Sequence, residues 1–412
     1  RQQIWWFSTL ERAARRADNG CWTRRLWLEV EVACSGPITA MEPRHAHLFG
    51  VLGLALGTAA LGNVWREAAR LWRLGAWVNR VSDPLCGGLA VAVLGGWVVG
   101  VVWEAHAGRA PFSRPNLLAL PLWAGLAVGA MAVTALSVTA AIVSPELAAG
   151  LWYAGLALQL AVLGGAAAAA LVGGCRRRED RRAILTAADF TPLLYPITVG
   201  IGMLPTAAQV AVHPKSTAID TLDDVLAWAA VVITFALTGP VAVQLLRNLS
   251  LEGGEAQLAV PSAVVQMAPF GLAFMGYDSA GLTGSGDPSG ALTVMLVAGS
   301  LLSSALILLY LPYLVRMSFA PTWSALTFPL VASTHVMVRY RSLDSHDTVA
   351  AQLAFGVVAA TYLAVSSAVV ALVWVRLVIY LVGRAFSASG TAVLSATLEP
   401  EEPTSLGRES PL

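Results

Sequence analysis

The sequence predicts an all-α polytopic membrane protein with ten transmembrane helices. Of its 412 residues, 57% are hydrophobic and only 12% are charged, and the mean hydropathy is +0.67. A helix needs roughly 20 apolar residues to cross the hydrocarbon core of a bilayer. Ten stretches of about that length lie between Leu48 and Gly383. A soluble domain of this size has neither this composition nor these runs.

The apolar stretches divide the chain into three regions. Residues 1–46 are expected to form a cytoplasmic arm, either disordered or a mis-assigned extension, residues 47–384 the ten-helix transport domain, and residues 385–412 a disordered tail rich in Ser, Thr, Glu and Pro. The links after the third and seventh stretches are short and nearly uncharged, so neighbouring helices are expected to pair as five helical hairpins. In chain order the predicted helices are 48–65, 85–103, 117–140, 147–174, 190–212, 222–246, 260–280, 289–314, 320–340 and 349–383.

Helix breakers distinguish the odd-numbered segments from the even-numbered ones. Prolines 121, 192, 196, 205, 269, 321 and 329 fall in odd segments, whereas the even segments contain chiefly Pro240 and, at an end, Pro312. Such breaks survive at membrane depth where protein or a water-filled cavity satisfies the freed backbone groups. The odd segments are therefore expected to form an inner, pore-lining ring, although glycine and proline also serve simple helix packing. The pore-lining or kink candidates are Gly53, Gly57, Pro196, Gly200, Pro205, Pro269, Gly271 and Pro329.

The distribution of basic residues predicts the topology. With the N-terminus inside, eighteen basic residues lie on the cytoplasmic side and seven on the other side. Both ends of the chain are therefore expected to be cytoplasmic. The single Lys among 26 basic residues, with abundant Ala, Gly, Val and Arg, indicates a high-GC genome. We expect a multi-pass protein of a bacterial plasma membrane, in contact with lipid and not with nucleic acid.

The predicted membrane interior contains few charged, titratable or metal-binding residues. The interiors of the odd segments contain no Asp, Glu, Lys or Arg, so they offer neither a negative ring to gather cations nor a buried cation to trap an anion. Partial positive charge at broken helices would favour small anions. His335, towards the outer end of the ninth segment, is a candidate for proton coupling, unless it is simply hydrogen-bonded or exposed to water. Four cysteines lack CxxC spacing, and His45 and His47 have no further ligand nearby, so no metal or cofactor is expected.

Four stretches together resemble one transporter family. They are LGTAALGNVW at 56–65, Thr191-Pro192 with Val199-Gly200 and Pro205, MAPFGLAFMGY at 267–277, and FAPTWSALTFP at 319–329. They are similar to the tellurite-resistance and dicarboxylate transporter family, which includes plant guard-cell slow anion channels and fungal malate and sulfite transporters. The chain departs from that pattern at Leu52 and Ala55, where the family usually has Phe and Pro.

The resemblance implies both an architecture and a gate. It implies hairpins in a pseudo-fivefold arrangement around a central pore, with odd helices inside and even helices outside, commonly as a homotrimer. A Phe on the ninth helix plugs the pore in that family, and the matching residue here is Phe328. The alternative for Phe328 is a packing role beside the kink at Pro329.

The expected function is transmembrane transport of small inorganic or organic anions, as in voltage-dependent or slow-type anion channels. The alternative is a proton-coupled carrier of C4-dicarboxylates, sulfite or tellurite-related oxyanions. A membrane-embedded enzyme or scaffold is disfavoured, because catalysis would need clustered His, Asp or Glu inside the bundle. The sequence leaves the anion open among chloride, nitrate, sulfite, malate and oxyanions of tellurium, and does not specify what opens the gate.

Overall fold

The computed structural model describes residues 48–108, 112, 120–179, 193–249, 264–282, 290–308, 319, 321–343 and 348–397. All regular structure in these ranges is helical. The expected N-terminal arm, residues 1–46, lies outside the described residues, as do His45 and His47. The last helix continues to Thr397, so it covers the first part of the segment expected as a tail.

Each of the ten predicted segments corresponds to one helix or one broken helix. Three odd segments contain 3-10 turns, denoted η, whereas the even segments are each a single α-helix. The elements are α4 (Leu52–Leu71), α5 (Trp77–His106), α7 (Leu120–Ala140), α8 (Pro145–Glu179), α9 (Leu194–Thr198), η2 (Val199–Gly202), α10 (Met203–Ala211), α11 (Thr217–Leu249), η3 (Val264–Met267), α13 (Ala268–Ser279), α14 (Ala291–Leu308), η4 (Pro321–Leu326), α16 (Thr327–Ser342) and α17 (Val349–Thr397).

Seven helical stretches in the described ranges are long and apolar enough to cross a membrane, and Ala291–Ala305 of α14 is a shorter apolar helix. The seventh and ninth segments are not among the seven, and their α-helical parts are short, with 12 residues in α13 and 16 in α16. The chain is thus an all-helical, multi-pass membrane protein.

Burial separates the odd helices from the even ones. In the most apolar stretches of α4, α7 and α9–α10, 72%, 61% and 72% of residues are buried, against 17%, 17%, 33% and 22% in α5, α8, α11 and α17. The even helices instead expose large apolar side chains such as Val99, Trp103 and Leu302. The predicted interior position of the odd segments is confirmed, and the even helices present the apolar surface that lipid requires.

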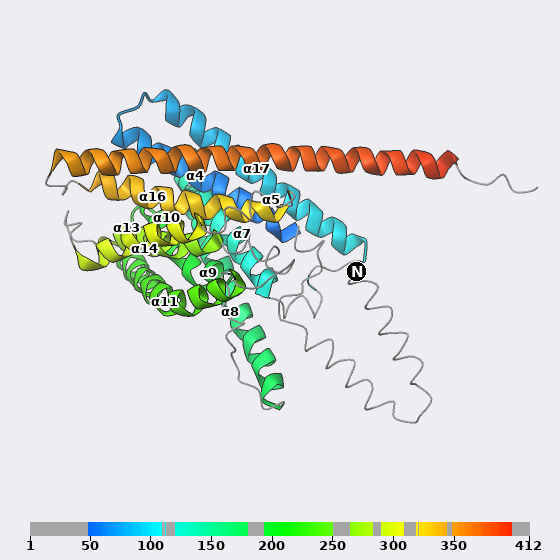
Figure 1. The fold of residues 1–412 in the computed structure, drawn as a ribbon, viewed down its shortest axis with the longest axis horizontal. Helices are drawn as coiled ribbons and strands as arrows, with labels where there is room; N and C mark the ends of the chain where they lie inside the picture. The colour runs from blue at the N-terminus through cyan, green and yellow to red at the C-terminus, as the bar shows by residue number, and fades with distance from the viewer. Residues whose placement is uncertain are drawn as a thin grey trace, which may run out of the picture.

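The inner helices contact one another in a closed circuit. Helix α4 packs on α7, α7 on α10, α10 on α13, α13 on α16, and α16 returns to α4. Each inner helix also packs on the outer helix that follows it in the chain, and α17 contacts both α16 and α4. Figure 1 shows α17 as a long rod beside these two helices. We call this circuit of five helices the inner ring.

The inner helices run in the same direction. Their C-terminal ends are joined by side-chain contacts, from α4 to α7 (Asn63 to Ala135), from α10 to α13 (Thr206 to Ser279) and from α4 to α16 (Glu67 to His335). We call the end of the molecule where these helices finish the distal end. By the distribution of basic residues it is the predicted extracytoplasmic end.

Candidate functional site

The start of α16 is docked tightly on α4. The hydroxyl of Thr327 donates to Gly53 O at 2.8 Å and to Ser324 O at 2.7 Å, and the Ser324 hydroxyl donates to Gly50 O. A Cβ placed on Gly57 would lie 2.3 Å from Thr327 Oγ1 and 3.0 Å from the backbone nitrogen of Phe328. Glycine on α4 therefore permits the close approach that fixes the backbone of Phe328.

Pro329 explains why η4 gives way to an α-helix here. It occupies the third position of α16, inside the first turn. Pro329 has no N–H to bond the carbonyl of Ala325, four residues earlier, and its ring crowds that carbonyl, so the α-helical bonding pattern does not extend back into η4. The kink predicted at Pro329 is thus a junction between two helix types, and Phe328 lies at this junction, 7% exposed.

Contacts on both sides of α16 identify its inward face. Thr334 donates to Tyr362 O of α17 at 3.2 Å, and the Tyr340 ring packs on Phe355 of α17 with centroids 5.1 Å apart. On the opposite side, His335 pairs with Glu67 of α4 at 3.4 Å.

Phe328 shares this inward face with two charged or titratable residues. His335 and Arg339 follow it by seven and eleven residues, which at about 100° per residue places all three on one side of the helix. Arg339 binds Asp278 of α13 at 2.5 Å, while His335 reaches α4. A face that contacts both ring neighbours of α16 is directed into the ring, away from α17.

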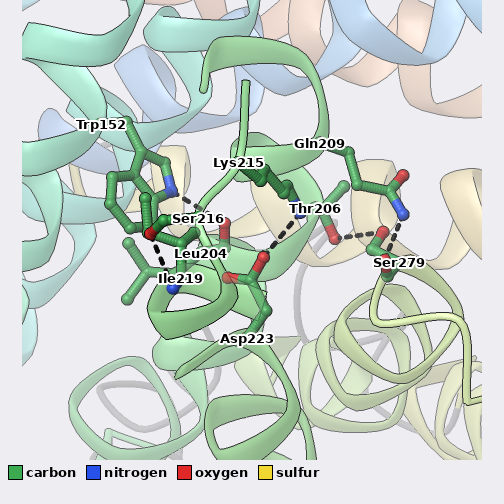
Figure 2. Close-up of polar contacts among 9 residues, drawn as sticks. All are labelled: Trp152, Leu204, Thr206, Gln209, Lys215, Ser216, Ile219, Asp223 and Ser279. Carbon is green, nitrogen blue, oxygen red and sulfur yellow. Dashed lines mark hydrogen bonds and ion pairs between the residues drawn. The ribbon is translucent and has the colours of Figure 1, made fainter. Parts of the chain in front are cut away.

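Side chains of the outer helix α8 donate hydrogen bonds to backbone carbonyls of the broken fifth segment. Pro196 lies in α9 and Gly200 in η2. The Gln159 amide of α8 donates to Pro196 O at 3.0 Å and to Ile197 O at 3.3 Å. Pro205 lies in the first turn of α10, and Trp152 of α8 donates to the preceding carbonyl, Leu204 O, at 2.9 Å (Figure 2). Backbone carbonyls on both sides of the break thus accept hydrogen bonds from α8, and such bonds stabilise broken helices away from water.

The seventh segment repeats this pattern. Pro269 follows η3 at the second position of α13, and Thr234 of α11 donates to its carbonyl at 3.3 Å. A Cβ on Gly271 would lie 3.2 Å from the Ala332 backbone of α16. The candidates Gly53, Gly57 and Gly271 therefore lie at inner-helix contacts. Gly200 faces Met131 of α7 and Gln159 of α8. A pore-lining role for these positions stays a prediction.

Ion pairs gather at the distal end. Besides the two pairs on α16, Arg66 of α4 pairs with Asp83 of α5 at 3.0 Å, and Lys215 pairs with Asp223 at the start of α11 at 2.7 Å (Figure 2). Asp223 lies in the second turn of α11, and Asp220 is the acidic residue of its first turn. Sequence reasoning missed Glu67 and Asp278 as partners, because their neighbours in space are distant in the chain.

Hydrogen bonds also join α10 to α13 at this end. The Ser279 hydroxyl donates to Thr206 Oγ1 at 3.1 Å, and the Gln209 amide donates to Ser279 O (Figure 2). No group of three His, Cys, Asp or Glu suited to a metal occurs among the described residues. The site is thus a helical ring with a charged distal end and an aromatic residue on its inward face.

Comparison with known families gives one match. The family described as SLAC1, voltage-dependent anion channel, matches residues 49–378. This range begins just before α4 and ends within α17, so it covers the inner ring and the outer helices. Comparison with curated proteins gives no significant match.

Proposed function

Because the chain belongs to the voltage-dependent anion channel family, whose members transport anions, we propose that small anions cross the membrane through the inner ring and that Phe328 gates their path. One observation carries the proposal: the face of α16 that bears Phe328 is directed into the ring, between α4 and α13. The opposite face is occupied by α17. The packing alternative for Phe328 would place it on a face between helices.

A phenylalanine at this position suits a hydrophobic gate. Its ring is large and apolar, and hydrophobic constrictions close pores by excluding water. The hydrogen bonds of Thr327 hold the backbone beside it to α4. The side chain can thus change rotamer while its attachment stays fixed, which is what a gate on a rigid frame requires.

Among the described residues, the middle of the path on either side of Phe328 carries no fixed charge. Helices α10, α13 and α16 continue directly from 3-10 turns, and the residue before each of them keeps helical dihedral angles, so no free helix N-terminus lies at these junctions. The ionised side chains of the described inner helices lie in their C-terminal parts, at the distal end. An anion would therefore meet no carboxylate in the middle of the path.

The proposed arrangement is pseudo-fivefold, with five hairpins around the ring, and the assembly is a homotrimer by resemblance to the family. The circuit of inner contacts and the pairing of each inner helix with its successor support the first part. The exposed apolar faces of the even helices leave room for lipid or for neighbouring protomers. Mass measurement in detergent or nanodiscs tests the trimer. Cysteine labelling from each side tests cytoplasmic ends in the plasma membrane.

The second candidate is a proton-coupled carrier of C4-dicarboxylates, sulfite or tellurite-related oxyanions. The pair of His335 with Glu67 favours it, because a titratable group on the inward face is what proton coupling needs. A carrier would accumulate malate or sulfite against a gradient when only a pH difference is imposed. A channel would not.

The test is anion flux in proteoliposomes containing wild type or Phe328→Ala, with chloride, nitrate and malate supplied in turn. We expect the variant to raise flux at least severalfold, because removing the ring opens the constriction. Phe270→Ala is the matched control, since Phe270 is equally buried, at 6%, but packs on Gly299 of α14 and Phe235 of α11. Equal flux in the two variants would refute a gate at Phe328.

A further inference from the structure

Four side chains on the distal part of the inner ring form one connected group, the distal charge cluster: Glu67, Asp278, His335 and Arg339. Glu67 Oε2 lies 3.4 Å from His335 Nε2, and Asp278 Oδ2 lies 2.5 Å from Arg339 Nε. His335 and Arg339 are four residues apart on α16, so the two pairs are neighbours on one face of this helix. The cluster therefore spans three consecutive helices of the ring, α13, α16 and α4.

Each of the two pairs in the cluster joins a buried side chain to a partly exposed one. The side chains of Asp278 and His335 are 5% and 9% exposed, whereas those of Glu67 and Arg339 are 33% and 40% exposed. One carboxylate and one guanidinium thus face accessible space, and each is held by a buried partner. A guanidinium carries five N–H donors, and Nε of Arg339 donates to Asp278 Oδ2.

Other charged groups near α16 are directed elsewhere. Arg66 of α4 turns to Asp83 and Val138 O. Arg341 lies beside Gly356 of α17, and Tyr362 of α17 reaches α16 through its carbonyl. The described residues of η3, η4 and α14, which also pack on α16, include no charged or titratable side chain. Arg70, one turn after Glu67 on α4, is exposed to solvent, so the charge of the cluster is counted over its four members.

Protonation of His335 changes that charge. With a neutral imidazole, two carboxylates and one guanidinium leave a net charge of −1, and half-exposed Glu67 repels an arriving anion. With a protonated imidazole the net charge is zero, because His335 neutralises Glu67 and leaves Arg339 as the exposed charge.

We propose that the distal charge cluster is a proton-controlled admission site for small monovalent inorganic anions, of the class of chloride and nitrate, with Arg339 as the contacting group. The inference rests on the proposed function, since it concerns the path that Phe328 closes. His335 lies seven residues beyond Phe328, about 10 Å along the helix. The cluster thus admits anions to the distal side of the gate, and the proton stays on His335 instead of travelling with the anion.

The expected effect follows from removal of one unit of charge. At about 6 Å and an effective dielectric constant of about 40–80, a unit charge changes local anion occupancy about three- to tenfold. Nitrate flux at low ionic strength should therefore rise about three- to tenfold when pH on both sides falls from about 8 to about 5. High salt should reduce this difference by screening.

The test measures this pH response in the Phe328→Ala background, where the gate does not limit flux. His335→Gln should give low flux at both pH values. Glu67→Gln removes one negative charge, so it should raise flux at both pH values and keep the increase on acidification. His213→Gln is the matched control, because His213 lies in the loop between α10 and α11 outside the cluster, and it should keep the full response at the flux of the Phe328→Ala protein. Flux that is insensitive to pH in the Phe328→Ala protein, or a response that survives in His335→Gln, would overturn the admission site while leaving anion transport intact.

If no variant conducts any anion, the proposed function itself is refuted. The admission site is then tested by a binding measurement. Because anion binding and His335 protonation are linked, nitrate added to detergent-solubilised protein at about pH 6.5 should cause proton uptake. The uptake should persist in His213→Gln and disappear in His335→Gln. Absence of uptake in the wild type, or its persistence in His335→Gln, would overturn the site.

Discussion

Gly57→Ala is expected to loosen the docking of α16 on α4. The added Cβ would lie 2.3 Å from Oγ1 and 2.6 Å from Cβ of Thr327, and 3.0 Å from Phe328 N. Ordinary contacts between carbon atoms need about 3.5 Å or more, so the helices must separate by roughly 1 Å. Small residues allow close backbone approach in membrane proteins, and this contact depends on it.

The magnitude has three parts. Overpacking of this kind costs about 1–3 kcal/mol. Separation also weakens the bond of 2.8 Å from Thr327 to Gly53 O, worth about 0.5–1.5 kcal/mol. Replacing a helical glycine by alanine returns about 0.5–1 kcal/mol. The net loss of stability should be about 1–3 kcal/mol.

Thermal unfolding of the detergent-solubilised protein measures this loss, and the flux assay measures the gate. We expect a lower melting temperature together with altered anion flux, because Phe328 moves with α16. Gly88→Ala is the matched control, since no side chain or backbone atom lies within 4 Å of its added Cβ. A melting temperature for Gly57→Ala at or above that of the wild type, as expected for Gly88→Ala, would refute the close-packing argument.

Two other substitutions test the polar contacts that support the ring. Gln159→Leu leaves Pro196 O and Ile197 O without their donor and should cost about 1–3 kcal/mol; loss of stability no greater than in Leu158→Ala, at an exposed position of α8, would contradict this. Arg66→Met leaves the buried Asp83 without its partner and should cost about 3–5 kcal/mol. Adding Asp83→Leu should recover most of that loss in the same thermal assay, and failure to recover would show that the charge pair is not the cause.

Much of the fold could be predicted from composition and from the placement of helix breakers. The ten apolar segments were evident because crossing a bilayer demands length and apolarity. The interior position of the odd segments followed from Pro196, Pro205 and Pro269, since broken backbone cannot face lipid. The structure confirms that position by burial.

The partners of the breaks and charges could not be predicted in the same way. Gln159 lies 37 residues from Pro196, and Thr327 lies 274 residues from Gly53. Which residues meet depends on the rotation of each helix about its axis, and apolar sequence leaves that rotation undetermined. For the same reason, the sequence placed Gly57 on an inner helix but did not predict its contact with Thr327. Phe328 was found through family resemblance, and its face became clear only from the contacts of α16.

The order of these contacts along the chain has a consequence for biogenesis. Gln159 and Trp152 donate hydrogen bonds to backbone carbonyls of the broken fifth segment, and they are synthesised before it. That segment therefore enters the membrane with its hydrogen-bond donors already inserted, and its open carbonyls need not meet bare lipid. The contacts of Ser324 and Thr327 with the start of the first segment form later. Gly50 and Gly53 are synthesised early, but their carbonyls can accept these hydrogen bonds only after Ser324 and Thr327 have been translated. Closure of the circuit by α16 is then a late step of assembly, and it precedes the packing of α17 on α16 and α4.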